Sequence, residues 1–173
     1  KVPVGHGKAI RFVATDVEGV LHGRTWAGTA LDGRDSIRPV THTLYSFIGN
    51  DLVGISSHDA STSLIGASGI SPPGLDVSPG GTMYGGSGGR LWTFDLATGA
   101  SSEVGPTDIS SFPSLAFSPD GRLFGASNGT DQLYEIDPLT GAVTPGAELD
   151  INLATSGMDF ASDGTLYLVE GGT

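Results

Sequence analysis

The feature that most constrains the fold is a unit of about 40 residues that recurs along the chain. Residues 78–100, SPGGTMYGGSGGRLWTFDLATGA, align with residues 118–142, SPDGRLFGASNGTDQLYEIDPLTGA, so that Gly81 and Gly121 are 40 positions apart. A third copy at 161–173, ASDGTLYLVEGGT, contains only the first half of the unit. This period is typical of solenoids and propellers, in which each unit is one small supersecondary structure.

Each unit has the pattern of a short antiparallel meander. In SLAFSPDGRLFGAS, two apolar segments flank Pro119-Asp120-Gly121, a turn sequence in which Pro sets φ and Gly accepts a positive φ. QLYEIDPLTGAVTPG alternates apolar and polar residues before a second turn at 137–141. With 28 Gly and 10 Pro in 173 residues and no helical periodicity, we predict an all-β chain. Three or four short strands per unit indicate a β-propeller.

We therefore predict a single β-propeller domain over residues 1–173, built from four or five short antiparallel blades. Clear blades are expected at 74–105 and 112–147, a partial blade at 156–173, and degenerate blades within 8–70. The upstream copies depend on Leu21-His22-Gly23 and Leu52-Val53-Gly54, which resemble Met83-Tyr84-Gly85 at steps of 31 residues. Five blades follow if that step is real, and four follow if residues 8–60 form one blade with an insertion.

The segment 118–142 resembles the blades of secreted bacterial β-propeller repeat proteins that carry the signature xLYxIDPxTGA. In its small unit size the chain is also similar to tachylectin-like five-bladed propellers. The match extends over 74–147 and is partial at 156–173. This resemblance implies a binding or scaffolding module that is secreted and acts outside the cell or at its surface. Because the signature consists of packing and turn residues, it implies a fold more strongly than a role.

The last copy of the unit predicts a half-blade with an unpaired strand edge. We expect the N-terminal segment KVPVGHGKAIRFVA to complete this blade, from the same chain or from a neighbouring one. Completion by a neighbour gives head-to-tail contacts, which form rings or filaments. Residues 1–40 carry six basic and four acidic residues, whereas residues 41–173 carry two basic and fifteen acidic residues. This asymmetry favours attraction between the head of one copy and the tail of another, or else reflects a solvated acidic surface.

Composition excludes several classes of partner and chemistry. A net charge of −11 with dispersed Lys and Arg argues against nucleic acid, and no apolar run approaches the ~20 residues of a membrane span. The chain has no Cys, and its four His show no metal-binding spacing. GGSGG at 85–89 matches the G-x-S-x-G string but lies between two predicted strands, where a nucleophile elbow needs a helix. We expect no catalytic residue, no metal and no cofactor.

Two groups of residues are candidates for binding. Trp26, Arg34 and Arg38 lie in a segment that fits no blade strand, and an aromatic ring beside guanidinium groups suits stacking and carboxylate pairing. Trp92 and Tyr134 occupy equivalent positions in the two clear units. They either pack between blades or form a repeated platform on which sugars stack.

One further residue is a candidate for modification. Asn128-Gly129-Thr130 is a sequon in a Gly-containing turn, and it makes Asn128 a candidate glycosylation site in a secreted protein.

Three functions remain open at this point. The first is a non-enzymatic extracellular structural or interaction module that self-associates head to tail into a homo-oligomer, a larger assembly or a filament. The second is a carbohydrate-binding, lectin-like propeller with a glycan ligand. The third is a fragment of a larger propeller hydrolase or lyase.

Overall fold

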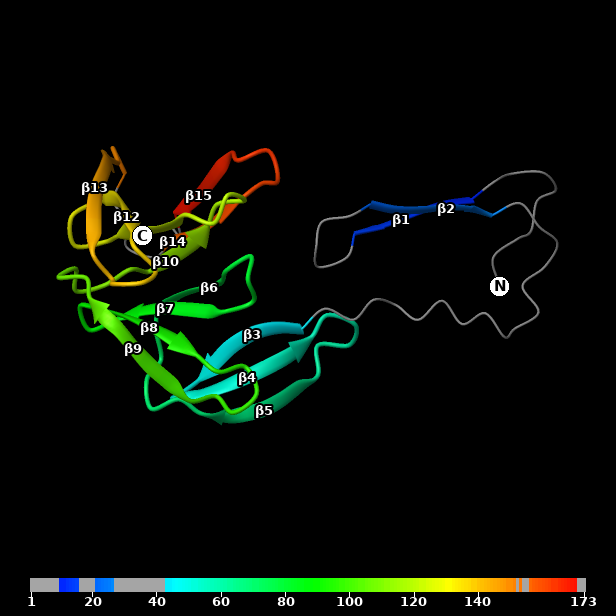
Figure 1. Cartoon of the computed structure of the whole chain (residues 1–173), viewed down its shortest axis with the longest axis horizontal. Helices are drawn as coiled ribbons and strands as arrows, with labels where there is room; N and C mark the ends of the chain where they lie inside the picture. Colours follow the sequence, from blue (N-terminus) through cyan, green and yellow to red (C-terminus); the bar gives the residue numbers. More distant parts are fainter. Residues whose placement is uncertain (1–9, 16–20, 27–42, 152, 154–155, 171–173) are drawn as a thin grey trace. The chain divides into compact units, whose positions relative to one another are not determined.

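The computed structural model describes residues 10–15, 21–26, 43–151, 153 and 156–170. In these residues the chain is all-β, with five small antiparallel sheets and no helix, as predicted (Figure 1). The chain forms two compact units, residues 1–40 and residues 41–173, which are described separately. The prediction of a single domain over the whole chain stays a prediction.

In the first unit, residues 10–15 and 21–26, which are the described ones, form an antiparallel hairpin. Its strands are β1 (Ile10–Thr15) and β2 (Leu21–Trp26), which pair in continuous register from Ile10 opposite Trp26 to Thr15 opposite Leu21. This register leaves five residues, 16–20, to join the strands.

The second unit contains four sheets in which strands adjacent in sequence are adjacent in space (Figure 1). The first sheet comprises β3 (Thr43–Ile48), β4 (Asp51–Ser56) and β5 (Thr62–Ala67). The second comprises β6 (Gly74–Val77), β7 (Met83–Ser87), β8 (Arg90–Phe94) and β9 (Ser101–Pro106). The third comprises β10 (Ser114–Phe117), β11 (Leu123–Ser127), β12 (Gln132–Ile136) and β13 (Val143–Glu148). The fourth comprises β14 (Ser156–Phe160) and β15 (Leu166–Glu170).

The turn between the first two strands of a sheet is the one expected from the sequence. Gly121 has a φ of +87°, and its N–H donates to the carbonyl of Ser118 at 2.8 Å. Gly81 repeats this turn with a φ of +85°, a region that residues with a Cβ seldom adopt. The repeated SPxG sequence therefore encodes the same hairpin in successive sheets.

The repeated aspartates shape the outer turns, which join the third strand of a sheet to its outer, fourth strand. Asp137 Oδ1 accepts from the N–H of Leu139 at 2.8 Å, and its Oδ2 accepts from the Thr140 hydroxyl at 2.8 Å. Asp95 Oδ1 accepts from the N–H of Ala97 at 2.7 Å. The backbone hydrogen bonds, followed by those from the threonine hydroxyls, hold the pKa of both carboxyls below the ordinary value. These two acids therefore have a turn-forming role.

Neighbouring sheets pack through aromatic pairs on their first two strands. Tyr84 on β7 meets Phe117 on β10 edge-to-face, with ring centroids 5.3 Å apart. Phe124 on β11 meets Phe160 on β14 at the equivalent place, with tilted rings whose centroids are 5.4 Å apart. Phe112, which is 1% exposed, belongs to the buried cluster formed with β8 and with β10–β12. The core thus lies between sheets, which stack like the blades of a propeller.

The outer strands contact the outer turn of the following sheet. A Cβ built on Gly105 of β9 would lie 2.1 Å from the carbonyl oxygen of Thr140, in the turn between β12 and β13. A Cβ built on Gly66 of β5 would likewise lie 2.0 Å from the carbonyl oxygen of Thr98, in the turn between β8 and β9. Glycine at these positions therefore permits one backbone to touch the next.

These contacts correct the alignment of the upstream copy. Since Gly66 and Gly105 make equivalent contacts, β5 corresponds to β9 and β4 to β8. The N–H of Ser68 donates to the carbonyl of Asn50 at 2.8 Å, and the N–H of Thr107 donates to the carbonyl of Gly89 at the same distance. These matching hydrogen bonds support the same correspondence.

The step of 31 residues consequently does not connect equivalent strands. Gly54 lies on β4, which corresponds to β8, whereas Gly85 lies on β7. The match failed because it depended on three residues and did not include the outer turn. Gly23 lies on β2 in the other unit.

Asp76 joins the first strands of two sheets. Its Oδ1 accepts from the N–H of Val77 at 2.7 Å, and its Oδ2 accepts from the N–H of Phe117 on β10 at 2.6 Å. Burial raises the pKa of Asp76 above its ordinary value, although the two hydrogen bonds oppose the rise. Asp159, the corresponding residue of β14, adds to the rise by charge repulsion.

We expect Asp76→Asn to lower the free energy of unfolding by about 1–3 kcal/mol at neutral pH. The amide has one acceptor oxygen where the carboxyl has two, so either the N–H of Val77 or the N–H of Phe117 loses its acceptor. Since the folded pKa is raised, the contribution of this carboxyl is largest below the ordinary aspartate pKa of about 3.9. It declines as the pH rises through the raised value. Urea unfolding of both proteins from pH 3 to pH 7 should show the wild-type advantage shrinking with rising pH. An advantage that grows instead would contradict this account.

Candidate functional site

The first candidate site is the outer edge of β15. This strand pairs with β14 from Leu166 opposite Phe160 to Glu170 opposite Ser156, and within residues 43–170, as far as they are described, no strand pairs with its other edge. In the sheets of four strands, the corresponding strands β7 and β11 are each paired on both sides. β15 therefore offers a row of backbone N–H and C=O groups for a further strand.

The side chains of β15 are correspondingly exposed. Tyr167 is 61% exposed and Val169 is 66% exposed. Gly86 and Ala126, which take the place of Val169 on β7 and β11, are both buried. An apolar β-branched residue at a position that is buried in the complete sheets indicates a surface that association would cover.

A second candidate site is a hollow of about 330 Å³ between the turn that joins β10 to β11 and the turn that joins β14 to β15. Phe124 and Phe160 contribute aromatic rings, and the Arg122 guanidinium lies 5.0 Å from the ring centre of Phe124. The carboxyls of Asp120 and Asp163 lie at its rim. Aromatic rings beside carboxylates and hydroxyls are groups that can contact a sugar.

The charged groups of this hollow already have hydrogen-bond partners, and the partner of Arg122 is Glu135, which lies outside the lining. Arg122 donates from Nε to Glu135 Oε1 at 2.9 Å and from Nη2 to Glu135 Oε2, and this partner lowers the pKa of Glu135. A hydrogen bond from Ser118 lowers the pKa of Asp120, and one from the backbone of Thr165 lowers that of Asp163. All three carboxyls are therefore charged at neutral pH, which makes them hydrogen-bond acceptors and poor general acids.

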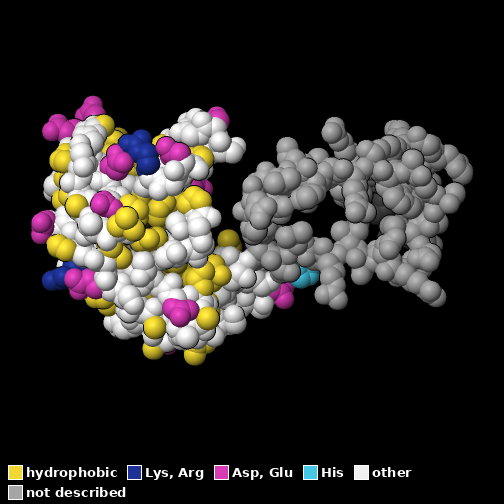
Figure 2. Space-filling view, viewed as in Figure 1, with side chains coloured by type: hydrophobic (Ala, Val, Ile, Leu, Met, Phe, Trp, Pro, Cys, Tyr) yellow, Lys and Arg dark blue, Asp and Glu magenta, His cyan; other side chains and the backbone are white. Residues whose placement is uncertain are grey.

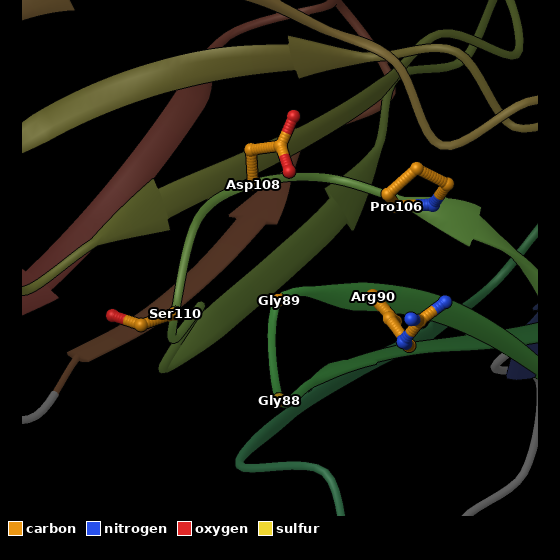
Figure 3. A pocket seen from close by; sticks show the side chains of 6 residues that line it. All are labelled: Gly88, Gly89, Arg90, Pro106, Asp108 and Ser110. Atoms are coloured by element: carbon orange, nitrogen blue, oxygen red, sulfur yellow. The ribbon is translucent and has the colours of Figure 1, made fainter.

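A third, more open hollow of about 410 Å³ lies at the turn between β7 and β8 (Figure 3). Its lining residues are Gly88, Gly89, Arg90, Pro106, Asp108 and Ser110. Figure 3 shows that the side chains of Arg90, Asp108 and Ser110 do not converge on one point, and Arg90 is paired with Glu103. The hollow thus lacks the mutual geometry of a nucleophile and a base.

The G-x-S-x-G string is a hairpin turn, as predicted. Ser87 ends β7 and Arg90 begins β8, so that Gly88 and Gly89 alone form the turn, with φ values of +62° and +73°. The sequence around Ser87 is therefore strand, turn and strand, which does not form a nucleophile elbow.

Trp92 and Tyr134 occupy equivalent places, opposite Gly85 and Gly125 in the strand registers. Trp92 is half-buried and donates from Nε1 to the Ser87 carbonyl at 3.2 Å. Tyr134 is 5% exposed, and its hydroxyl hydrogen-bonds the hydroxyl of Thr130 at 3.1 Å. These contacts agree with the packing alternative, and a sugar platform at either ring stays a prediction.

The other predicted site residues receive little structural information. Trp26 ends β2, but its side chain lies outside the part of the chain that is described, as do Arg34 and Arg38 entirely. Asn128 is exposed in the turn between β11 and β12, and its glycosylation stays a prediction. The hollow at Phe124 and Phe160 was not predicted, since its two halves come from different copies of the repeat.

The surface and the ionisable residues add three observations. On the face of the second unit shown in Figure 2, acidic side chains are scattered, and the basic ones lie beside acidic ones. Among the described residues there is no group of three or more His, Cys, Asp or Glu side chains placed to hold a metal ion. The same residues include no helix of the length and apolarity that a membrane span requires.

Comparison with solved structures gives similar folds at low sequence identity. An auxiliary nutrient binding protein of Bacteroides ovatus is 14% identical over 75% of this chain and 33% of its own, with a TM-score of 0.60. A Bacteroides thetaiotaomicron protein of unknown function is 17% identical over 75% and 40%, also with a TM-score of 0.60. A streptogramin B lyase is 18% identical over 92% and 55%, with a TM-score of 0.52.

The chain thus spans about a third to just over half the length of these proteins. No family model and no curated protein matches the sequence. Since all the identities are below one fifth, the likeness concerns the fold and carries no function. Together with the sheets described above, it establishes that this chain has an all-β fold of the propeller type.

Proposed function

We propose that this chain is a non-enzymatic, extracellular interaction module that associates head to tail with further copies of itself. The observation that carries the proposal is the outer edge of β15, with its exposed Tyr167 and Val169. Addition of a strand there would pair the free backbone groups and bury the two side chains. The opposite charge balance of residues 1–40 and 41–173 supports a contact between unlike ends.

A non-enzymatic role is supported by the chemistry of the two hollows. One holds carboxyls with lowered pKa beside a paired guanidinium, and the other holds side chains that do not converge. Enzymes instead gather groups whose pKa values are shifted toward the working pH.

Sedimentation velocity over a range of concentrations tests the proposal. We expect larger species to appear as the concentration rises, and electron microscopy to show extended assemblies. Raising the salt concentration should weaken the association, because charges at the surface are screened. Val169→Lys should weaken it about tenfold or more, since the charge would have to be buried against the added strand. The matched control is Leu139→Lys, at a site that is 83% exposed in an outer turn.

A chain that remains a compact monomer at high concentration and low salt would rule the proposal out. Equal loss of association in the Leu139 and Val169 variants would show that β15 is not the site of contact.

Carbohydrate binding is the second candidate, and the hollow beside Phe124 and Phe160 is the observation that favours it. A glycan that protects the association-deficient Val169 variant from thermal unfolding would support this candidate independently of self-association.

A further inference from the structure

We propose that the β1–β2 hairpin is the outer half of a blade and that it completes the β14–β15 sheet of a second copy. This inference rests on the proposed function and names the segment that occupies the edge of β15. The argument uses the backbone pairing of the hairpin, its sequence and its spacing from β3.

The sequence of β1 and of the turn after it matches that of the third strand of a complete sheet and its turn. RFVATD at 11–16 aligns with RLWTFD at 90–95 and with QLYEID at 132–137. In all three, an aspartate directly follows the third strand and a glycine follows within four residues.

The backbone pairing agrees with this alignment. Thr15 pairs with Leu21 across five intervening residues, and Phe94 pairs with Ser101 across six. Phe12 falls at the position of Leu91, which is completely buried in its sheet. The hairpin departs from the complete sheets in three respects. Its loop is one residue shorter, and Thr15 replaces an apolar residue. Its register is also continuous, whereas a register shift interrupts the β8–β9 pair and the β12–β13 pair.

The spacing to the next sheet gives an independent reason. Sixteen residues separate the end of β2 at Trp26 from the start of β3 at Thr43. Sixteen residues likewise separate the end of β9 at Pro106 from the start of β11 at Leu123. Since β4 and β5 correspond to β8 and β9, β3 corresponds to β7 and β11. The hairpin therefore has the place along the chain that the outer half of a preceding blade would have.

The register of the β7–β8 pair then predicts the contacts between copies. Met83 lies opposite Phe94 and Ser87 lies opposite Arg90. The same register would place Glu170 of one copy opposite Arg11 of the other, which is a pair of opposite charges.

This register also provides an apolar partner for the exposed part of β15. Val169, which is 66% exposed, would lie opposite Phe12 of the second copy. In this register the apolar Phe12 faces the apolar Val169, and the adjacent cation and anion also face one another.

A charge exchange tests the predicted register. Arg11→Glu and Glu170→Arg should each weaken self-association about tenfold, because like charges would then lie opposite one another. The chain that carries both substitutions should regain most of the lost affinity in sedimentation experiments. If neither single substitution changes the affinity of self-association, the predicted register is wrong. It is also wrong if the double substitution lowers the affinity by the combined effect of the two single ones.

Disulfide cross-linking tests the identity and the origin of the hairpin, because the native chain has no Cys. Ala14→Cys and Tyr167→Cys, made in separate chains and mixed under oxidising conditions, should give a disulfide-linked heterodimer on a non-reducing gel. Its yield should be several-fold higher than with Ala14→Cys and Val169→Cys, since the diagonal pair is about 7–8 Å apart and exceeds the reach of a disulfide.

The outcomes separate this inference from the proposed function. Association without the specific cross-link would leave the proposed function standing and reject the hairpin as the partner. A chain that carries both cysteines and forms the cross-link within itself as a monomer would reject the second copy. Absence of any association would reject both proposals.

Discussion

Replacing Phe112 by alanine is expected to lower the free energy of unfolding of the second unit by about 3–5 kcal/mol, the largest stability effect that we predict. The side chain is 1% exposed and lies between two sheets. A Cβ built on Gly125 of its own sheet would lie 2.6 Å from the Phe112 ring, and one built on Gly86 of the preceding sheet would lie 3.0 Å from it. Truncation would therefore leave a cavity that faces both sheets, and two glycines offer no side chain to fill it.

Urea unfolding monitored by tryptophan fluorescence measures this effect, since Trp92 lies in the neighbouring sheet. Leu139→Ala is the control, because its side chain is 83% exposed and such changes usually alter stability by about 0.5 kcal/mol or less. Equal losses of unfolding free energy in the two variants would show that the Phe112 side chain does not fill the space between the two sheets.

Gly105→Ala is expected to lower the free energy of unfolding by about 1–3 kcal/mol or more, although it adds only one methyl group. The new Cβ would lie 2.1 Å from the carbonyl oxygen of Thr140, a backbone atom that cannot move without displacing the whole outer turn. Gly66→Ala should reproduce the effect, because its Cβ would lie 2.0 Å from the Thr98 oxygen.

Gly157→Ala is the matched control, since no atom lies within 4 Å of a Cβ built at that position. Thermal and urea unfolding of the three variants would test the account. A Gly105 variant as stable as the Gly157 variant would show that the outer turn does not press on β9.

The strands and turns between residues 74 and 147 could be predicted from the sequence because their signals are local. Alternating apolar residues, SPxG turns and aspartates at the outer turns each act within a few residues. The all-β propeller type of fold followed from the repetition of these local patterns.

What could not be predicted depends on contacts between copies of the repeat. The approach of Gly105 to Thr140 and the place of Phe112 against Gly86 each join residues from different copies. The alignment at Leu52-Val53-Gly54 failed for the same reason. These residues lie on β4, and β4 is recognised as a third strand only because its neighbour β5 contacts the next outer turn through Gly66. Trp92 and Tyr134 were correctly paired with one another, but a sequence cannot show how far each ring is buried.

The contact of each outer strand with the next outer turn gives the chain a polarity. In both contacts, Gly66 with Thr98 and Gly105 with Thr140, the glycine belongs to the earlier sheet and the threonine-glycine turn belongs to the later one. A duplicated unit therefore carries one half of the contact at each end, and it fits between any two existing units without a new interface being invented. A repeat joined in this way can gain or lose whole units, because the same backbone contact, in the same direction, joins each unit to the next.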